Sequence, residues 1–500
     1  MNKTDNNPPI EAIVGCGESV ELIVGALGAA STPEVQYEAA WCVTNIASGT
    51  GGETARLVAA GAVGALGALV AGTDRAALRE QALWALGNVA GDGTAARDAV
   101  LGAPGLVAAV GAALGDATAP RTLVRTAAWT LLMLCRGDPA PPLRALRGIL
   151  PLLGALLHST DPEVIGDACA ALLCVAAPPP PSSTPASAAG AAEDNPNARV
   201  GAVVELGVMR RVAELLHHPG AAVQQCALRL LGRVAAGADA HTQTVVNVGA
   251  LPALRALLSS ARRAVRRDAC WALSNIAAGR REQVAALVAA GLLPPLLSAV
   301  RTDPAPDVRR EAAYAVANAC CAGAVALVQE VALAGALDAL AGVLAEGAGA
   351  GGSDARLLAA VLDALEHIVR AGDYGVPGQV GDANVLLVRA EELGVVPRLE
   401  ALALHHADAA VADAAEHLLR RFNDADDDEA ADFFDDREGD GDDEAFKTLM
   451  DDAEDDEDDD GEDVITVPDM PSAGPAAVSS PPPAFQFTAQ TPQKSSLFFQ

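Results

Sequence analysis

The chain has 500 residues, of which 51% are hydrophobic, 20% charged and only 3% aromatic, so its core must be built from small aliphatic side chains. This composition excludes collagen-like, disulfide-scaffold and coiled-coil proteins. The net charge of -31 is uneven, because residues 424–463 hold 24 Asp and Glu against Arg437 and Lys447, which leaves -9 for residues 1–423. We expect a folded body, residues 1–423, and a disordered acidic tail, residues 424–500, that buries too little apolar surface to fold.

The start of the chain shows no basic stretch followed by an apolar run, so we expect no secretory signal and a protein that stays inside the cell. Uncharged stretches such as 99–115 are too short for a membrane span and contain Gly and Pro. The nine cysteines show no Cys-x-x-Cys spacing, and the eight histidines show no ligand spacing. We therefore expect buried thiols in a reducing compartment, with no metal and no cofactor.

The body repeats itself. Seven segments, from VQYEAAWCVTNIASG to VRREAAYAVANACCAG, align without gaps, and the equivalent positions are 41, 84, 129, 170, 229, 271 and 314. The one long step, from 170 to 229, contains a Pro-, Ser- and Ala-rich insertion at 178–197 that we expect to form a surface loop.

A glycine follows the repeat position by 20 or 21 residues, where it would allow a tight break between helices. These glycines are Gly61, Gly105, Gly249, Gly291 and Gly335. Each is followed by apolar residues at helical spacing, so each unit is two or three helices within about 42 residues, the length of armadillo and HEAT repeats. We expect an all-α, right-handed superhelical solenoid of about ten such repeats over residues 10–422, in which each repeat buries its apolar face on its neighbours.

One repeat position holds all four tryptophans and Tyr314, and asparagine stands four residues later on the same helix face. The aromatic residues are Trp41, Trp84, Trp129, Trp271 and Tyr314, and the amides are Asn45, Asn88, Asn275 and Asn318. In a single repeat, Trp would serve as core and Asn as a helix cap. Their recurrence across the array predicts instead a ladder of indoles and amides on the concave surface.

Such a ladder suits an extended peptide rich in Lys and Arg. Each carboxamide offers a donor and an acceptor to the peptide main chain, and the indoles form slots for long side chains. Cation-π attraction would add about 0.5 to 2 kcal/mol for each stacked cation. Acceptors for the charged ends lie about one turn before or after the ladder, at Gln81, Asp92, Asp239, Asp268 and Glu311.

The signatures EAAWCVTNIASGT, EQALWALGNVAGDG, AAWTLLMLCRG and DACWALSNIAAG resemble the importin-alpha family over residues 6–430. This resemblance implies an armadillo adaptor that shuttles between cytoplasm and nucleus and binds the nuclear localisation signals of cargo for import with importin-beta. It implies a major peptide site at Trp41, Asn45, Thr50, Gln81, Trp84, Asn88, Asp92 and Trp129. It implies a minor site at Arg229, Asp239, Asp268, Trp271, Asn275, Glu311, Tyr314 and Asn318.

The chain departs from the family pattern at several ladder positions, which hold Met133, Ala170, Cys174 and Arg233. Losing one amide clamp costs about 1 kcal/mol, or about 1 to 3 kcal/mol if a peptide group stays buried and unpaired. Lys3 is the only basic residue before Arg56, whereas the family begins with a basic arm that binds importin-beta. Either the sequence is truncated or it is a variant without direct coupling to the carrier. By resemblance, residues 380–422 correspond to the repeat that the family's nuclear export receptor grips.

Other function classes find less support. The sequence has no Walker motif, no His-Glu-x-x-His and no Gly-x-Ser-x-Gly, so we expect no enzyme, and the acidic body argues against a nucleic-acid partner. We expect no membrane partner. The remaining alternative is a general armadillo scaffold for protein interactions without import activity. The acidic tail is interpreted as a solubilising extension or, alternatively, as an attractor of basic partners.

Overall fold

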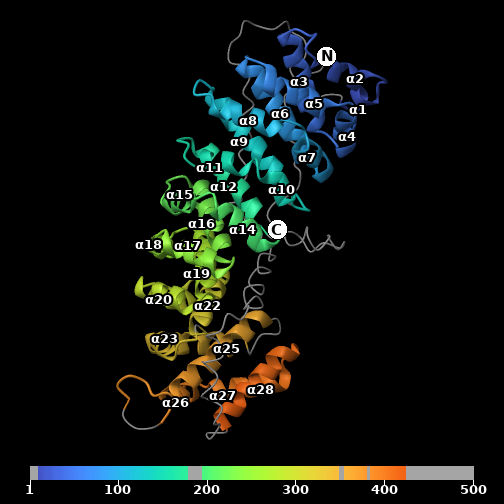
Figure 1. The fold of residues 1–500 in the computed structure, drawn as a ribbon. Helices are drawn as coiled ribbons and strands as arrows, with labels where there is room; N and C mark the ends of the chain where they lie inside the picture. The colour runs from blue at the N-terminus through green and yellow to red at the C-terminus, as the bar shows by residue number, and fades with distance from the viewer. Residues whose placement is uncertain (1–9, 178–193, 322, 348–353, 380–382, 424–500) are drawn as a thin grey trace. The chain divides into compact units, whose positions relative to one another are not determined.

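A computed structural model describes residues 10–177, 194–321, 323–347, 354–379 and 383–423 (Figure 1). Every regular element in these ranges is helical. The chain divides into two compact units, which we describe separately. Unit 1 comprises the residues up to Arg211 together with Gly220–Cys226, and unit 2 comprises Val212–Pro219 and the described residues from Ala227 onward.

Unit 1 is built from triplets of helices. They are α1 (Ile10–Gly15), α2 (Ser19–Ala26), α3 (Pro33–Ala47); α4 (Gly51–Ala59), α5 (Ala62–Gly72), α6 (Ala76–Asp92); α7 (Thr94–Leu101), α8 (Leu106–Gly115), α9 (Arg121–Cys135); α10 (Leu143–Leu146), α11 (Leu150–Leu156), α12 (Pro162–Ala176); and α14 (Pro196–Val204). Helices α15 (Met209–Leu215) and α16 (Ala221–Ala235) each have residues in both units.

Unit 2 continues the same pattern. Its helices are α17 (Asp239–Asn247), α18 (Leu251–Leu257), α19 (Arg263–Ala277); α20 (Arg281–Ala289), α21 (Leu293–Thr302), α22 (Pro306–Cys320); α23 (Val325–Val331), η1 (Ala332–Ala336), α24 (Leu337–Gly347), α25 (Ala355–Gly372); and α26 (Val385–Glu392), α27 (Val395–His405), α28 (Ala409–Asn423). The described residues thus hold nine repeats of three main helices, close to the ten that the sequence predicts.

Helices of the same kind stack in rows within each unit. In unit 1 the third helices α3, α6, α9 and α12 pack one on the next, as do α5 and α8. In unit 2 the third helices α19, α22, α25 and α28 form the corresponding row. The interfaces are aliphatic: Leu83 and Leu86 of α6 are fully buried. Burying such a side chain contributes about 1.5 to 3 kcal/mol, so each repeat depends on its neighbours for its core.

The break between first and second helices falls at the glycines that the repeat predicts. All five have a left-handed backbone, with φ from 69° at Gly291 to 109° at Gly335. A side chain would strain this conformation, whereas glycine adopts it freely. The paired helices bend by 68° between α4 and α5 and by 84° between α20 and α21. The glycine prediction is therefore confirmed, and Gly207 and Gly394 adopt the same conformation without having been predicted.

One helical run in the described residues, Val325–Gly347, is long and apolar enough by composition to cross a membrane. It is broken at Gly335, and 56% of its apolar window is buried within the protein, where its parts pack against α21, α22 and α25. Its apolar character is thus accounted for by the repeat core.

Two sequence predictions fall partly or wholly outside the described residues. Of the expected loop at 178–197, residues 178–193 lie outside them, and the last two, Pro196 and Asn197, begin helix α14. Asn195 caps this helix by accepting a hydrogen bond from the Ala198 amide at 2.8 Å. The acidic tail from residue 424 also lies outside the described part.

Candidate functional site

The unit-1 ladder comprises Trp41 and Asn45 on α3, Trp84 and Asn88 on α6, and Trp129 on α9. Because α3, α6 and α9 pack in sequence, these rungs follow one another across neighbouring helices. The three indoles and Asn88 are partly exposed, and Asn45 is buried at 8% exposure. The pair Trp84 and Asn88 is thus open to solvent, as a binding surface requires.

The amides of this ladder also brace the helices. The Asn88 side-chain amide donates to the Thr44 carbonyl oxygen of the preceding repeat at 3.0 Å. Gln81 donates to the Thr44 hydroxyl at 2.8 Å, and Asn45 donates within its own helix to the Trp41 carbonyl at 2.9 Å. One donor of each amide is therefore used inside the protein, which fixes where the amide oxygen lies.

One indole of this ladder packs directly against a glycine of the neighbouring helix. A Cβ added at Gly87 would overlap the six-membered ring of Trp129, so the ring lies directly on the α6 backbone. Four residues further along each helix, Met133 Sδ lies 3.4 Å from where a Gly91 Cβ would be. Met133 is buried at 8% exposure and fills, with an apolar side chain, the place where the family has an amide. Gly87 was missed in the sequence, although it stands three residues after Trp84.

Thr50 and Asp92 each lie at a junction between the third helix of one repeat and the first helix of the following repeat. Thr50 begins α4, where its amide donates to the Glu53 carboxylate at 2.6 Å and its hydroxyl does so at 3.0 Å. The partly exposed Asp92 ends α6, and its carboxylate lies 3.4 Å from where a Gly51 Cβ would be. Asp92 therefore lies against Gly51, the residue after Thr50, at the first turn of α4, where the helix dipole favours a carboxylate.

The unit-2 ladder comprises Trp271 and Asn275 on α19 with Tyr314 and Asn318 on α22. Asn275 donates to the Gly232 carbonyl at 3.2 Å, and Asn318 donates to the Ser274 carbonyl at 3.0 Å, as Asn88 does in unit 1. Only Trp271 is partly exposed; the other three are buried.

Tyr314 is held inside the protein at the second rung of the unit-2 ladder. Its hydroxyl donates to the Asp354 carboxylate at 3.3 Å, and burial raises the pKa of this phenol. The second rung is thus more enclosed than the sequence suggests.

An arginine side chain of the protein itself lies over the indole ring of Trp271. The ring packs on Gly232, where an added Cβ would overlap it, as Trp129 packs on Gly87. The Arg233 guanidinium carbon lies 5.7 Å from the ring centroid, within the range of a cation-π contact. By the family resemblance, an asparagine is expected at the position of Arg233.

The acidic residues of the predicted minor site are likewise paired with arginines. Asp268 accepts from Arg229 at 3.0 Å and from Arg267 at 2.8 Å. Asp239 lies at the start of α17 and pairs with Arg280 at 2.8 Å. The sequence predicts these carboxylates as acceptors for a peptide; in the structure, Asp239 and Asp268 accept hydrogen bonds from the protein's own side chains.

Glu311 of α22 is buried, at 4% exposure. Burial raises the pKa of its carboxyl to about 7, against the opposing pull of Arg310 and Arg267. Its oxygen lies 3.7 Å from the Arg310 Nε atom. Glu311 therefore exchanges its proton close to neutral pH.

Asp167 is an acidic residue that the sequence analysis did not single out. It stands three residues before Ala170, as Gln81 stands before Trp84 and Asp268 before Trp271. Burial, with Glu163 and Asp161 nearby, raises the pKa of its carboxyl to about 7. The shared position before the ladder residue is the signal that would have found it.

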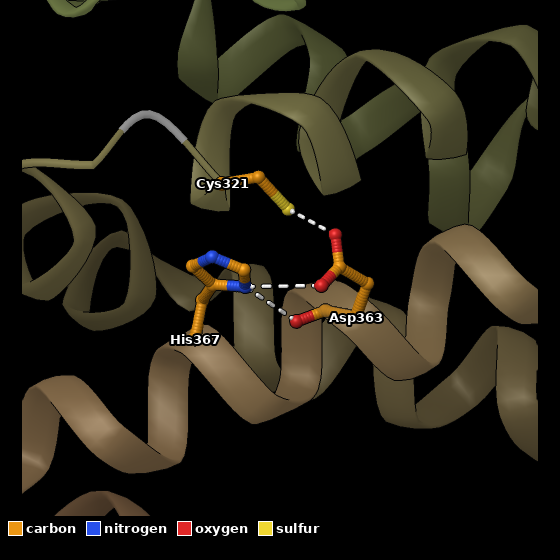
Figure 2. A group of neighbouring side chains, drawn as sticks. All are labelled: Cys321, Asp363 and His367. Atoms are coloured by element: carbon orange, nitrogen blue, oxygen red, sulfur yellow. Dashed lines mark hydrogen bonds and ion pairs between the residues drawn. The ribbon is translucent and has the colours of Figure 1, made fainter. Parts of the chain in front are cut away.

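A further cluster lies at the interface of α22 and α25 (Figure 2). Cys321, directly after α22, contacts Asp363 of α25, and Asp363 contacts His367 one turn along the same helix. None of these residues belongs to the predicted sites.

Comparison with known proteins agrees with this architecture. A family model, Armadillo/beta-catenin-like repeat, matches residues 238–278 and 280–321. The crystal structure of an engineered protein superposes with a TM-score of 0.68 and 28% identity, covering 84% of this chain and 92% of the other. The predicted all-α armadillo solenoid is thus confirmed for the described residues.

The curated relatives with similar sequences are importin alpha subunits. Importin subunit alpha-1b of Oryza sativa subsp. japonica is 38% identical over 239 residues, which are 48% of this chain and 41% of that protein. Importin subunit alpha-2 of Arabidopsis thaliana is 40% identical over 214 residues, which are 43% of this chain and 36% of that protein. The chain thus spans about two fifths of the length of these relatives. Over the matched part, the resemblance to the importin-alpha family is confirmed.

Proposed function

We propose that this protein is an adaptor that binds Lys- and Arg-rich nuclear localisation signals of cargo along the unit-1 ladder, for import into the nucleus. The observation that supports this most is the succession of partly exposed indoles on adjacent helices, with the partly exposed Asp92 at the C-terminal end of α6. The relatedness to importin alpha subunits supports the same function.

In this proposal the peptide crosses the unit-1 helices in extended form. The stem of one basic side chain lies between the indoles of Trp84 and Trp129, and its charged end reaches toward Asp92. The amide oxygens, already oriented by their donor bonds, accept from peptide N–H groups. Each stacked cation contributes about 0.5 to 2 kcal/mol, so several slots are needed for micromolar affinity, which is about 8 kcal/mol. Trp41, Asn45, Thr50 and Gln81 complete the proposed major site.

Unit 2 would contribute the weaker site. A peptide cation there competes with Arg233 for Trp271 and with Arg229 and Arg267 for Asp268. Replacing one intramolecular ion pair by another gains little net free energy, so the second cluster of a bipartite signal adds less affinity than the first. The proposed minor site keeps the residues predicted from the resemblance, with Asn275, Tyr314 and Asn318 acting mainly through the packing of α19 and α22.

The wider cycle is proposed from the same relatedness. The protein would shuttle between cytoplasm and nucleus, deliver cargo with importin-beta, and return through an export receptor that contacts the repeats at 380–422. It would act by binding and would catalyse no reaction.

Fluorescence anisotropy tests the proposal. A labelled bipartite signal peptide and its Lys-to-Ala version are titrated against the full chain at two salt concentrations. We expect micromolar or tighter binding that depends on the lysines and weakens with salt. Equal, weak binding of the two peptides would refute the adaptor and favour the general armadillo scaffold.

A further inference from the structure

Three potential metal ligands point toward one another between the repeats of α22 and α25 (Figure 2). The Cys321 sulfur lies 3.3 Å from Asp363 Oδ2, and His367 Nδ1 lies 3.3 Å from Asp363 Oδ1. All the ligand atoms lie within 4.8 Å of one another. His367 is fully buried, whereas the other two residues are partly exposed.

The two helices hold these side chains in place. Asp363 and His367 stand four residues apart on α25, which puts them on one face, one turn apart. Cys321 is the C-cap of α22, which packs against α25. The C-terminal end of a helix carries partial negative charge, so this end of α22 favours a cation.

A cavity borders one residue of the cluster. It has a volume of about 470 Å³, lies between α25 and α28, and has Asp363 among its lining residues. Its walls hold four carboxylates, Asp363, Glu366, Asp413 and Glu416, against the two basic side chains His417 and Arg420. A net acidic cavity beside the cluster raises the local concentration of divalent cations.

We infer that Cys321, Asp363 and His367 bind a divalent transition metal, of which Zn²⁺ fits best. A zinc ion holds sulfur at about 2.3 Å and nitrogen or oxygen at about 2.0 to 2.2 Å, so neighbouring ligands of a tetrahedral site lie about 3.3 to 3.7 Å apart. The two separations of 3.3 Å, one to each oxygen of Asp363, lie at the short end of this range, and the carboxylate turns to present one oxygen to the ion. A thiolate with an imidazole selects Zn²⁺ over Ca²⁺ and Mg²⁺, which prefer oxygen ligands.

One proton leaves as the ion enters. In the metal-free protein the Cys321 thiol donates to Asp363 Oδ2, and His367 Nδ1 lies 2.8 Å from the Asp363 carbonyl oxygen, to which it can donate. The ion binds the Cys321 thiolate and Nδ1 of the neutral imidazole, so the thiol proton is released to solvent while the imidazole proton moves from Nδ1 to Nε2. Asp363 supplies a carboxylate oxygen, and a water completes the tetrahedron. The bound ion then links two consecutive repeats through their third helices.

Cobalt provides the test, because Co²⁺ occupies zinc sites and a bound thiolate gives it a charge-transfer absorption band. Reduced, metal-free full-length chain is titrated with Co²⁺ and then with Zn²⁺. We expect one thiolate-to-cobalt band that saturates at one ion per chain and is abolished by Zn²⁺. The acidic tail can hold cations through oxygen, but oxygen ligands give no such band.

Variants make the assignment specific. Cys321→Ser and His367→Gln should each weaken Co²⁺ binding by at least about tenfold, whereas Cys42→Ser, which changes another partly exposed thiol on α3, should leave it unchanged. Circular dichroism checks that each variant folds. Absence of the band in the natural chain would overturn the inference, as would an undiminished band in Cys321→Ser. Signal-peptide binding is measured separately, so failure of either proposal leaves the other testable.

Discussion

The two ladders share one sequence pattern but differ in what already occupies it. In unit 1, Trp84 and Asn88 are partly exposed and Asp92 lies beside the glycine that begins α4. In unit 2, Arg233 lies over Trp271, and Asp268 accepts from two arginines. The repeated aromatic and amide therefore define a shared scaffold for binding, and in unit 2 a peptide cation must compete with arginines of the protein itself for the indole and the carboxylate.

The two units also differ in the polar residues beside the ladder. At the corresponding helix junctions, Thr50 is the N-cap residue of α4 in unit 1, and Arg280 is the N-cap residue of α20 in unit 2. Arg280 pairs with Asp239. A basic peptide would meet a neutral side chain at the first junction and a like charge at the second. The difference teaches that two sites with equal signatures can differ in affinity through residues outside the signature.

The largest expected effect is loss of binding in unit 1. Asp92→Lys replaces the proposed partner of a peptide cation by a repelling charge, and we expect monopartite signal binding to weaken by about a hundredfold or more. Anisotropy measures the change. Asp74→Lys, on an exposed loop residue, is the matched charge reversal and should have little effect. Equal losses in both variants would show that net charge, and not the site, governs binding.

A pH effect of the order of 3 kcal/mol is expected from Glu311 in unit 2. Its folded pKa of about 7 lies above the unfolded value of about 4.3, so its contribution to stability is lost as pH rises from about 4 to about 7. Urea unfolding at pH 5 and pH 8 should show a larger fall in stability for the natural chain than for Glu311→Gln. The same pH dependence in both would contradict the raised pKa.

Gly87→Ala tests the packing of the Trp129 indole against α6 in unit 1. The new methyl group would overlap Trp129, and we expect a loss of stability of about 1 to 3 kcal/mol together with weaker signal binding. Gly64→Ala, in helix α5 with nothing within 4 Å of the added Cβ, should instead stabilise by up to about 1 kcal/mol. Thermal unfolding followed by circular dichroism compares the two. Similar behaviour of both alanines would mean that Trp129 does not depend on Gly87.

The smallest expected effect is a gain in unit 2. Arg233→Asn removes the cation over Trp271 and restores the amide of the family, so binding of a bipartite signal should tighten by about tenfold. A monopartite signal confined to unit 1 serves as the control and should bind unchanged. An unchanged bipartite affinity, with the fold intact, would show that Arg233 does not restrict this site.

The sequence predicts what depends on short spacing. The spacing of Trp84 and Asn88 and that of each helix-breaking glycine can be read within one repeat, and the repeat length follows from comparing the repeats; the structure confirms the glycines. Contacts between repeats lie beyond such reasoning. Asp268 is 39 residues from Arg229, and Cys321 is 42 residues from Asp363, so only the stacking of helices brings them together. The raised pKa of Glu311 is also beyond such reasoning, because it results from burial that depends on neighbouring repeats.

The hydrogen bond from a ladder amide to a carbonyl of the preceding repeat has a further consequence. Asn88, Asn275 and Asn318 bond to the carbonyls of Thr44, Gly232 and Ser274, each the residue just before the earlier ladder position that an amide or Arg233 holds. Because this bond recurs at three junctions, it sets the same offset between α3 and α6, between α16 and α19, and between α19 and α22. Segments of about 42 residues that carry this amide and its acceptor can therefore be exchanged or duplicated with their alignment kept, which makes these repeats a natural substrate for building altered receptors by recombination.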